Sequence, residues 1–475
     1  MIATSDFYID GAWRASRNPD RIPVINPATE ALAGDVAAGS AADVDTAVVA
    51  ARRAFPDFAA TPVEQRMALL DRIAHGLEAR GEDIIDAMVT EMGTSIGFAR
   101  ATQLPFGIAH IRVQAEVLRE YAFQVMQGTT AIRREPIGVC GLITPWNWPL
   151  YQITAKVGPA LAAGCTVILK PSELSPLSAR LFAEVVHDAG APSGVFNMIT
   201  GTGETVGRAM SEHPDIEMMS ITGSTRAGIQ VAQSAAPSIK RVVQELGGKS
   251  PNVFLDDADF THGVAKGVLS GFRNCGQSCS APTRMIVPRN RLAEVEALAV
   301  ETAEAIVVGD PRDEATGLGP IANGAQYDRV QELIQSGIDQ GARLLCGGPG
   351  RPEGLSRGFY ARPTVFSDVT MEMRIGREEI FGPVLSIFAY DSEDHAIEIA
   401  NDTIYGLGAH VQSADQDRAR RLAGRIRAGQ VHINYPNWDG KAPFGGFKQS
   451  GNGREYGAFG LEEYLEVKSI IGYNA

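Results

Sequence analysis

Two side chains of this sequence, a thiol and a carboxylate, lie where they could act together as nucleophile and general base. Cys279 lies in a run of small and polar residues, 274–282, where the backbone can approach a bound molecule closely. Glu245 ends a predicted strand and is soon followed by Gly247 and Gly248. A cysteine attacks as its thiolate, and a nearby carboxylate can take the proton. A lone cysteine is more often a buried small hydrophobic residue, so this pattern alone leaves both interpretations open.

The amide of Asn147 is a candidate donor to a developing oxyanion. It lies between Pro145-Trp146 on one side and Trp148-Pro149 on the other. Prolines and large aromatic rings restrict the backbone, and a rigid amide donor suits an oxyanion hole. The alternative is that the two tryptophans simply belong to the core.

Two segments could bind a dinucleotide. The glycine-rich run Gly201–Gly207 follows a predicted strand, but its spacing is one residue longer than the usual fingerprint. By itself that run is more typical of a tight turn. Lys170 and Glu173 close a buried apolar strand with a cation and a carboxylate, where a ribose could bind. A solvated turn remains the other interpretation of the second segment.

Composition and charge argue against several classes of protein. The 475 residues carry 43 Lys+Arg against 56 Asp+Glu, a net charge of −13, which repels a nucleic-acid backbone. The longest apolar stretch, residues 137–169, is broken by prolines and Lys156, so we expect no membrane span. The first residues show no secretory signal, and the five cysteines are irregularly spaced. A cytoplasmic protein without disulfides is therefore expected.

No metal site is expected from the sequence. The eight histidines stand alone, without a His-Glu-x-x-His pattern. Cys275 and Cys279 are four residues apart, but no second pair of ligands accompanies them, as a zinc site would require.

Alternating strands and helices must position these groups. Between Gly138 and Glu245, short apolar runs alternate with amphipathic segments such as Pro176–Asp188 and Glu204–Glu212. This order predicts βαβ units and a parallel, doubly wound sheet, on which ligands bind at the carboxyl ends of the strands. The predicted strands are Val139–Thr144, Thr166–Lys170, Val195–Thr200, Met218–Thr222 and Arg241–Glu245.

A second α/β region follows from about Pro251, so two large α/β domains are the minimum. We interpret the glycine-rich segment Phe444–Gly460 as irregular loop and the polar segment Tyr121–Glu135 as a protruding hairpin. The first hundred residues are predicted to be helical after a short β start, with Ser40 and Thr61 as N-caps. The strands predicted for the second region are Arg284–Val287, Arg343–Cys346, Val384–Tyr390 and Gln430–Asn434.

Seven motifs in order resemble the NAD(P)-dependent aldehyde dehydrogenase superfamily. The resemblance extends from Asn26-Pro27-Ala28-Thr29 to the C-terminus, and it departs from the common pattern only at Trp148, Phe447 and Ile221. These departures concern the substrate tunnel and packing. The motifs are Pro145-Trp146-Asn147-Trp148-Pro149, Lys170-Pro171-Ser172-Glu173, Thr222-Gly223-Ser224, Glu245-Leu246-Gly247-Gly248, Gly276-Gln277-Ser278-Cys279, Glu378-Glu379-Ile380-Phe381-Gly382-Pro383-Val384 and Pro443-Phe444-Gly445-Gly446-Phe447-Lys448.

The resemblance implies a catalytic role for five residues. Cys279 is similar to the family's nucleophile, Glu245 to the base that activates the hydrolytic water, and Asn147 to the oxyanion donor. Lys156 and Glu455 match positions sometimes assigned to a proton relay. The implied reaction is NAD-dependent oxidation of an aldehyde to the carboxylic acid, through a thiohemiacetal and a thioester on the cysteine.

The resemblance also implies NAD as the cofactor, with NADP as the alternative. Lys170 and Glu379 resemble a ribose-binding pair, and Phe381 matches the residue beside the nicotinamide. Glu173 would bind the adenosine ribose and repel a 2′-phosphate, which favours NAD. The implied cofactor set is Ile143, Thr144, Pro145, Trp146, Lys170, Ser172, Glu173, Gly203, Gly207, Gly223, Ser224, Leu246, Glu379 and Phe381.

The implied architecture is two doubly wound, Rossmann-like α/β domains with a small β arm for oligomerisation. Residues 1–120 and 138–246 would form the NAD-binding domain, and residues 247–440 the catalytic domain. The arm would consist of residues 121–137 and 460–475. Because such an arm reaches across a dimer, the resemblance implies a homodimer or a homotetramer.

The implied substrate is a small-molecule aldehyde. The candidate tunnel residues are mostly aromatic and include no arginine that could bind a carboxylate, which favours an uncharged aromatic or medium-chain aldehyde. They are Trp148, Tyr151, Gln152, Ser278, Ser280, Trp438 and Phe444.

Three alternatives compete with this interpretation. A hydrolase could use Cys279, Glu245 and Lys170 without a redox cofactor, but the motifs at 222–224 and 379–381 would then have no role. A non-catalytic protein could reuse the fold, although both Cys279 and Glu245 are present. An enzyme that passes its thioester to coenzyme A is the third, and such members typically lack the base.

Overall fold

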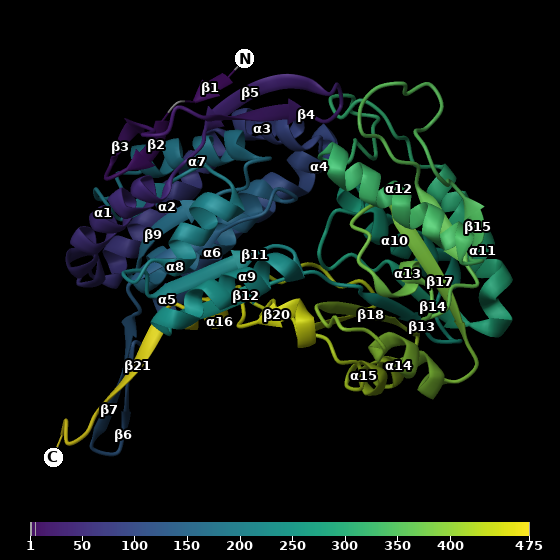
Figure 1. The fold of residues 1–475 in the computed structure, drawn as a ribbon. Helices are drawn as coiled ribbons and strands as arrows, with labels where there is room; N and C mark the ends of the chain where they lie inside the picture. The colour runs from purple at the N-terminus through teal and green to yellow at the C-terminus, as the bar shows by residue number, and fades with distance from the viewer. Residues whose placement is uncertain (1, 5, 475) are drawn as a thin grey trace.

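Two large β-sheets form the body of the molecule (Figure 1). The computed structural model describes residues 2–4 and 6–474. In that part of the chain one sheet has eight strands, another has seven, and two three-stranded sheets accompany them. The sequence predicts this mixed α/β architecture with parallel sheets, and the prediction is confirmed.

The eight-stranded sheet contains all five strands predicted for the first α/β region. Five central strands run parallel, and an antiparallel strand flanks them on each side. In spatial order the strands are β20 (Gly451–Asn452), β12 (Arg241–Glu245), β11 (Met218–Thr222), β8 (Val139–Ile143), β9 (Thr166–Lys170), β10 (Phe196–Met198), β2 (Asp6–Ile9) and β3 (Ala12–Ala15).

Helices cover both faces of this sheet, and the sheet separates two apolar cores, one on each face. The helices are α1 (Ala41–Ala59), α2 (Val63–Ala79), α3 (Gly81–Met92), α4 (Ile96–Phe98), α5 (Leu104–Glu120), α6 (Pro149–Ala163), α7 (Pro176–Asp188), α8 (Arg208–Glu212) and α9 (Thr225–Ala235). Leu142 and Leu169 pack in the core formed with α2, α5, α6 and α7. Ile143 and Ile168, one residue along each strand, pack against α1 on the opposite face. This alternation is the period of two expected for β-strands.

Local signals predict the start of α1 but not that of α2. The Asp43 carboxylate accepts a hydrogen bond of 3.0 Å from the Ser40 backbone N–H, so Ser40 caps α1 as predicted. The prediction for Thr61 is wrong, because Pro62 occupies the N-cap position of α2. The Thr61 hydroxyl instead donates to the Phe58 carbonyl at 2.6 Å, in the last turn of α1.

The seven-stranded sheet forms the second α/β unit, on the right of Figure 1. Its order is β15 (Arg343–Cys346), β16 (Thr364–Ser367), β17 (Val384–Tyr390), β14 (Arg284–Pro288), β13 (Pro251–Phe254), β18 (Gly408–Gln412) and β19 (Gln430–Ile433), with only β15 antiparallel to its neighbour. Its helices are α10 (Phe260–Phe272), α11 (Leu292–Glu304), α12 (Gly324–Asp339), α13 (Arg374–Arg377), α14 (Glu393–Asn401) and α15 (Gln416–Ala423). No helix of the described residues is long and apolar enough to cross a membrane.

A narrow three-stranded sheet projects from the body and carries the C-terminus at its tip (Figure 1). It pairs β6 (Gln124–Gln127) and β7 (Thr130–Pro136) as a hairpin, with β21 (Leu465–Ile470) antiparallel to β7. The other small sheet joins β1 (Ile2–Thr4), β5 (Ala31–Ala37) and β4 (Arg21–Asn26).

The segment Phe444–Gly460 is not entirely loop, which corrects the prediction. It contains β20, which pairs with β12 so that Gly451 lies opposite Glu245. It also leads into α16 (Gly457–Glu462), which packs against α5 and α6. The pairing partners lie about two hundred residues away in the chain, so no local pattern could indicate them.

Candidate active site

The carboxyl ends of four adjacent strands bring the predicted residues to one edge of the eight-stranded sheet. Ile143 in β8 lies opposite Lys170 in β9 and opposite Ile221 in β11. Thr222 in β11 lies opposite Glu245 in β12. Because parallel strands end at the same edge, the segments that follow each of them face a common region.

Two glycines after Glu245 allow the two domains to meet at this edge. A Cβ on Gly247 would lie 2.2 Å from Oε2 of Glu379, and a Cβ on Gly248 would lie 2.5 Å from the carbonyl oxygen of Cys279. Real Cβ atoms essentially never approach so closely, so Gly248 is required against the Cys279 backbone, and a side chain at position 247 would displace the Glu379 carboxylate. The Gly248 backbone N–H also donates a hydrogen bond of 2.9 Å to Oε1 of Glu379. This turn therefore packs the cysteine and a second carboxylate beside Glu245.

Cys279 is half-buried and lies against a small apolar cluster. That cluster includes Ala155, Leu407 and Phe444. Burial, assisted by the carboxylates of Glu379 and Glu245, raises the pKa of the Cys279 thiol. The thiol is therefore neutral in the protein as it stands and must lose its proton before it can attack a carbonyl carbon.

Asn147 is tied to the loop that carries the cysteine. Its Nδ2 donates a hydrogen bond of 2.9 Å to the Gln277 carbonyl, two residues before Cys279. Asn274 donates in return to the Asn147 carbonyl at 2.8 Å. An amide nitrogen carries two donors, and within the described residues Nδ2 of Asn147 makes one hydrogen bond. The second donor has no hydrogen-bond partner among the described residues.

Glu245 is a buried carboxylate without partners. It is 1% exposed, and neither of its oxygens has a hydrogen-bond partner among the described residues. Burial and the nearby Glu455 carboxylate raise its pKa well above the usual range, while Lys156 opposes the shift. A carboxylate in this state can accept a proton at a pH where an exposed one would already be fully ionised.

Lys156 and Glu455 form a buried ion pair behind Glu245. The Lys156 ammonium lies 2.5 Å from Oε1 of Glu455 and donates at 2.9 Å to the Ser220 hydroxyl. The lysine comes from α6 and the serine from β11, so the pair joins a helix, the sheet and the C-terminal segment. Both partners are at least 94% buried.

Several of the predicted cofactor residues surround the start of α9. The Ser224 hydroxyl caps this helix by accepting a hydrogen bond of 3.2 Å from the Ala227 backbone N–H. The Gly223 N–H donates to the Glu245 carbonyl at 3.0 Å. Helix N-termini favour anions such as a pyrophosphate. The hydroxyls of Thr144 and Thr222, at the ends of β8 and β11, are buried without partners among the described residues, which fits a ligand with polar groups at this edge.

The remaining predicted cofactor residues lie on both sides of the same edge. Lys170 is buried and donates at 3.0 Å to Oε2 of Glu173, which is about one-third exposed. The Trp146 and Phe381 rings meet edge to face with centroids 5.5 Å apart. Gly203 and Gly207 belong to a π-helical turn, Gly203–Gly207, so the predicted helix 204–212 is divided between this turn and α8. Ile143, Pro145, Ser172 and Leu246 are buried or half-buried in the neighbouring segments.

An aromatic cluster lies beside Cys279 and contains most of the predicted substrate residues. The Trp148 indole N–H donates to the Ser278 hydroxyl at 2.8 Å. The Tyr151 hydroxyl is hydrogen-bonded to the hydroxyl of Tyr456, and Phe444 stacks on Tyr456 with centroids 5.0 Å apart. Gln152 is buried with its Oε1 unpartnered among the described residues, Ser280 is half-buried, and Trp438 is 37% exposed.

The sequence analysis misses Phe106, His110 and Tyr456, which also belong to this cluster. Phe106 stacks on Trp438 with centroids 4.6 Å apart. The His110 ring lies 4.4 Å from that of Tyr151 and 4.3 Å from that of Tyr456. Phe106 and His110 are spaced by four on α5, a spacing that places both on one helix face. That spacing is visible in the sequence, but nothing in the chain around it indicates which partner the face meets.

Burial lowers the pKa of His110 to about 3, so the ring is neutral over the physiological range. Among the described residues, no group of three His, Cys, Asp or Glu side chains is arranged to hold a metal ion. All five cysteines carry free thiols. The site is therefore built from a thiol, carboxyl groups, lysines, an amide and aromatic rings.

Comparison with known proteins agrees with this geometry. A model of the aldehyde dehydrogenase family matches residues 13–470. A Pseudomonas protein named 3-succinoylsemialdehyde-pyridine dehydrogenase is 51% identical over 469 residues, which are 98% of each chain.

Solved structures extend the similarity to the whole fold. Aldehyde dehydrogenase C of Pseudomonas syringae, in complex with NAD+ and octanal, is 64% identical, with a TM-score of 0.98 over 99% of this chain and 97% of that one. A Mycobacterium tuberculosis aldehyde dehydrogenase in complex with NAD+ is 39% identical, with a TM-score of 0.96 over 99% of this chain and 98% of that one.

Proposed function

Because the chain belongs to the aldehyde dehydrogenase family, we propose that it oxidises an uncharged aldehyde to the carboxylic acid with NAD. The observation that carries the proposal is that Cys279 and Glu379 both pack on the glycine pair that follows Glu245. The proposed nucleophile and the proposed ribose-binding carboxylate then both contact the turn that follows the proposed base. A hydrolase would need only the nucleophile and the base.

Cys279 is the proposed nucleophile. Its thiol gives up its proton to Glu245 or to water, and the sulfur adds to the aldehyde carbon to form a thiohemiacetal. The free Nδ2 donor of Asn147 stabilises the oxyanion that forms on the substrate oxygen. NAD, when bound, would supply the acceptor for a hydride from this carbon, and Cys279 would then hold the acyl group as a thioester.

Glu245 is the proposed base for the second half-reaction. It takes a proton from a water molecule, the hydroxide attacks the thioester carbon, and the C–S bond breaks to release the acid and the thiol. Neither Glu245 oxygen has a hydrogen-bond partner in the described part of the chain, which supports this role, because the carboxylate is free to meet a water. Lys156 and Glu455 lie behind it and would carry the released proton away from the site.

The cofactor would lie along the edge where β8, β9, β11 and β12 end. Gly223 and Ser224 at the start of α9 would bind its pyrophosphate, and Lys170 with Glu173 the adenosine ribose. Glu379 and Phe381 would hold the nicotinamide half. The negative charge of Glu173 disfavours a 2′-phosphate, so NAD is the proposed cofactor over NADP.

The proposed substrate is an uncharged aldehyde with an apolar or aromatic body. The rings of Phe106, Trp148, Tyr151 and Trp438 contact one another and would line the way toward Cys279, and the neutral His110 adds no charge there. The names and titles of the relatives point the same way, since one is named for a pyridine semialdehyde and another contains octanal.

We further propose that the arm joins copies of this chain into a homodimer or homotetramer. Val467 on β21 is 66% exposed, and Val125 and Met126 on β6 are also exposed. Strands with open edges and exposed apolar side chains need a partner. Val467→Asp should lower the mass measured by light scattering during size-exclusion chromatography, and an unchanged mass would contradict this part of the proposal.

The proposed reaction is tested with purified protein, NAD and a panel of aldehydes. Formation of reduced nicotinamide is followed by absorbance, and the acid product is identified by mass spectrometry. We expect turnover of octanal and of aromatic aldehydes, with little for aldehydes that carry a carboxylate. Ester hydrolysis without any reduction of NAD would support the hydrolase instead and overturn the proposal.

A further inference from the structure

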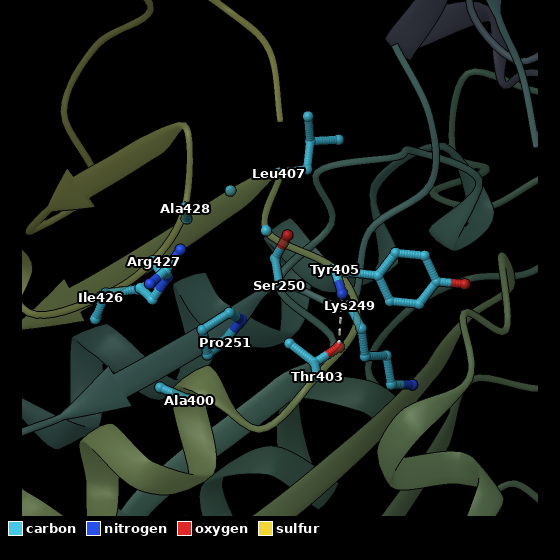
Figure 2. A pocket seen from close by; sticks show the side chains of 12 residues that line it. Lys249, Ser250, Pro251, Ala400, Thr403, Tyr405, Leu407, Ile426, Arg427 and Ala428 are labelled. Carbon is cyan, nitrogen blue, oxygen red and sulfur yellow. Dashed lines mark hydrogen bonds between the residues drawn. The ribbon is translucent and has the colours of Figure 1, made fainter. Parts of the chain in front are cut away.

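Lys249 is a buried cation that the proposed reaction does not use. It follows directly after Gly248, is 1% exposed, and its ammonium has no hydrogen-bond partner among the described residues. An unpaired buried ammonium is costly, so its retention calls for a reason. Figure 2 shows its side chain lying beside that of Tyr405 and pointing away from Ile426 and Ala428.

The adjacent carboxylates Glu378 and Glu379 differ in their partners. Glu378 is bound by the guanidinium groups of Arg329 and Arg374, the latter at 2.6 Å and 3.2 Å. Glu379 accepts one backbone hydrogen bond, from Gly248, and is in no ion pair among the described residues. The carboxylate without a cationic partner is therefore the one that packs on the turn leading into Lys249.

Arg284, the other cation close to Lys249, is already hydrogen-bonded to backbone carbonyls. Arg284 is fully buried and donates to the carbonyls of Lys249, Ile399 and Ala400, each at 2.8 Å. Those bonds fix the Lys249 backbone, whereas its ammonium has no hydrogen-bond partner among the described residues. Among the described residues Lys249 and Glu379 form no ion pair within 4.0 Å, so their charges act on each other at a longer distance, as charges do where water is excluded.

We propose that Lys249 acts on cofactor binding through Glu379: its charge anchors the carboxylate that lies against Gly247 and Gly248. The inference rests on the proposed role of Glu379 toward the cofactor. Lys249 touches neither substrate nor reacting atoms, so it is a positioning residue.

The charges around the pair agree with this assignment. Burial raises the pKa of Glu379 to about 7, opposed by the Gly248 hydrogen bond and by Lys249. Burial and Arg284 lower the pKa of Lys249 to about 7, opposed by Glu379 and Glu378. Burial and then the charge of Glu379 also raise the pKa of the Tyr405 hydroxyl and of the Cys279 thiol. Each of the two groups thus favours the charged form of the other.

The test measures NAD+ affinity by calorimetric titration of the full-length protein between about pH 6 and pH 10. Lys249→Met keeps the length of the side chain and removes its charge. Removing a nearby cation raises the pKa of a carboxyl group by about one to three units. We therefore expect the pH midpoint of NAD+ binding to move upward, with affinity at pH 7.5 reduced about threefold to tenfold and recovering near pH 10.

A double-mutant cycle separates this effect from a loss of structure. In a Glu379→Gln background, Lys249→Met should change NAD+ affinity less than twofold, because the charge it acts on is gone. Lys240→Met is the matched control. That lysine is also buried, donates to the His213 carbonyl at 2.5 Å, and lies at the opposite end of β12. The control should lower thermal stability and leave NAD+ affinity unchanged.

Unchanged affinity and midpoint in Lys249→Met, or an equal loss in the Glu379→Gln background, would overturn the inference. Lys249→Gln provides the same comparison should the methionine variant not fold. No NAD+ binding by the wild type would instead end the proposed function itself, and the inference with it.

Discussion

Two neighbouring groups of buried charged side chains differ in their hydrogen bonding. Lys156, Glu455 and Ser220 form a closed network in which the ammonium is bound on two sides. Glu245 and Lys249 are as deeply buried, yet neither makes a side-chain hydrogen bond among the described residues. The first group can be explained by structure alone, and the second cannot.

The difference has an energetic meaning. A buried polar group without a partner costs about 1–3 kcal/mol, and more when it is charged. A protein keeps such a group only where a ligand or a reaction needs it, as active sites often sacrifice stability for function. Substitutions in the partnered group should therefore lower stability first, and substitutions in the unpartnered group should lower function first.

Cys279→Ser should have the largest effect on function. A hydroxyl is a far weaker nucleophile than a thiolate, so aldehyde oxidation should fall by about 10⁴-fold or more. NAD binding and the thermal midpoint should stay near those of the wild type. Steady-state rates and calorimetry measure both quantities. Substantial residual activity would move the nucleophile elsewhere, with the buried Cys275 as the next candidate.

Glu245→Gln should separate the two half-reactions. The amide cannot accept a proton, so the thioester should form and then persist. Rapid mixing should show a burst of reduced cofactor near one equivalent per active site, followed by very slow turnover. Turnover at the wild-type rate would remove Glu245 as the base for hydrolysis.

The same variant should be more stable than the wild type at high pH. The pKa of Glu245 is raised in the folded protein, so the folded state binds its proton more tightly than the unfolded chain does. The stabilising contribution is full below the unfolded pKa near 4.5 and is lost as the pH rises through the folded value. Because glutamine does not titrate, the difference in free energy of unfolding should grow with pH. Equal stability at all pH values would contradict the unpartnered state of this carboxylate.

Lys156→Met, a change in the partnered group, should lower the stability of the protein. It leaves the Glu455 carboxylate buried without its cation, and breaking such a pair costs about 3–5 kcal/mol. Denaturant unfolding should reveal this loss, and a second change, Glu455→Gln, should restore part of it. A variant as stable as the wild type would show that the ion pair does not hold the helix, the sheet and the C-terminal segment together.

Much of the fold is encoded in local patterns. The strand Arg241–Glu245 is predicted with the bounds that the structure shows, because a short apolar run between helical segments is a local feature. Pairing is not local: β20 joins β12, and Tyr8 of β2 joins Met198 of β10 across the far side of the same sheet. The sequence carries no signal for such contacts, so β20 is mistaken for loop.

The candidate site divides in the same way. Cys279, Glu245 and Asn147 lie in unusual short motifs and can be singled out from the chain alone. Lys249 directly follows one of those motifs but is passed over, because its burial depends on segments that are distant in the chain, such as the one that carries Arg284. His110 has no motif around it, and its place in the aromatic cluster depends on the packing of α5 against α6.

Asn147→Ala should have an intermediate effect on the reaction rate, because one amide donor of Asn147 is hydrogen-bonded and the other is unpartnered among the described residues. One donor of its amide is used by the Gln277 carbonyl, and the other is available to the substrate. Losing an oxyanion donor typically costs about 10²–10³-fold in rate. The burst itself should be slowed by that factor, unlike the burst of Glu245→Gln. A normal burst rate with reduced stability would assign Asn147 to structure only.

Glu173→Gln should have the smallest effect on oxidation with NAD. It tests an ion pair of which only one partner, Lys170, is buried. Lys170 is buried, but its partner Glu173 is about one-third exposed, so the pair is screened by solvent and contributes about 1 kcal/mol or less. Glutamine can still accept the 3.0 Å hydrogen bond from Lys170, and stability should hardly change. The charge, however, is removed from the position where a 2′-phosphate would lie. Like charges in contact cost several kcal/mol, so kcat/KM with NADP should rise by about tenfold or more while that with NAD falls only slightly. Measured with both cofactors at low ionic strength, an unchanged ratio would show that Glu173 does not face the adenosine ribose.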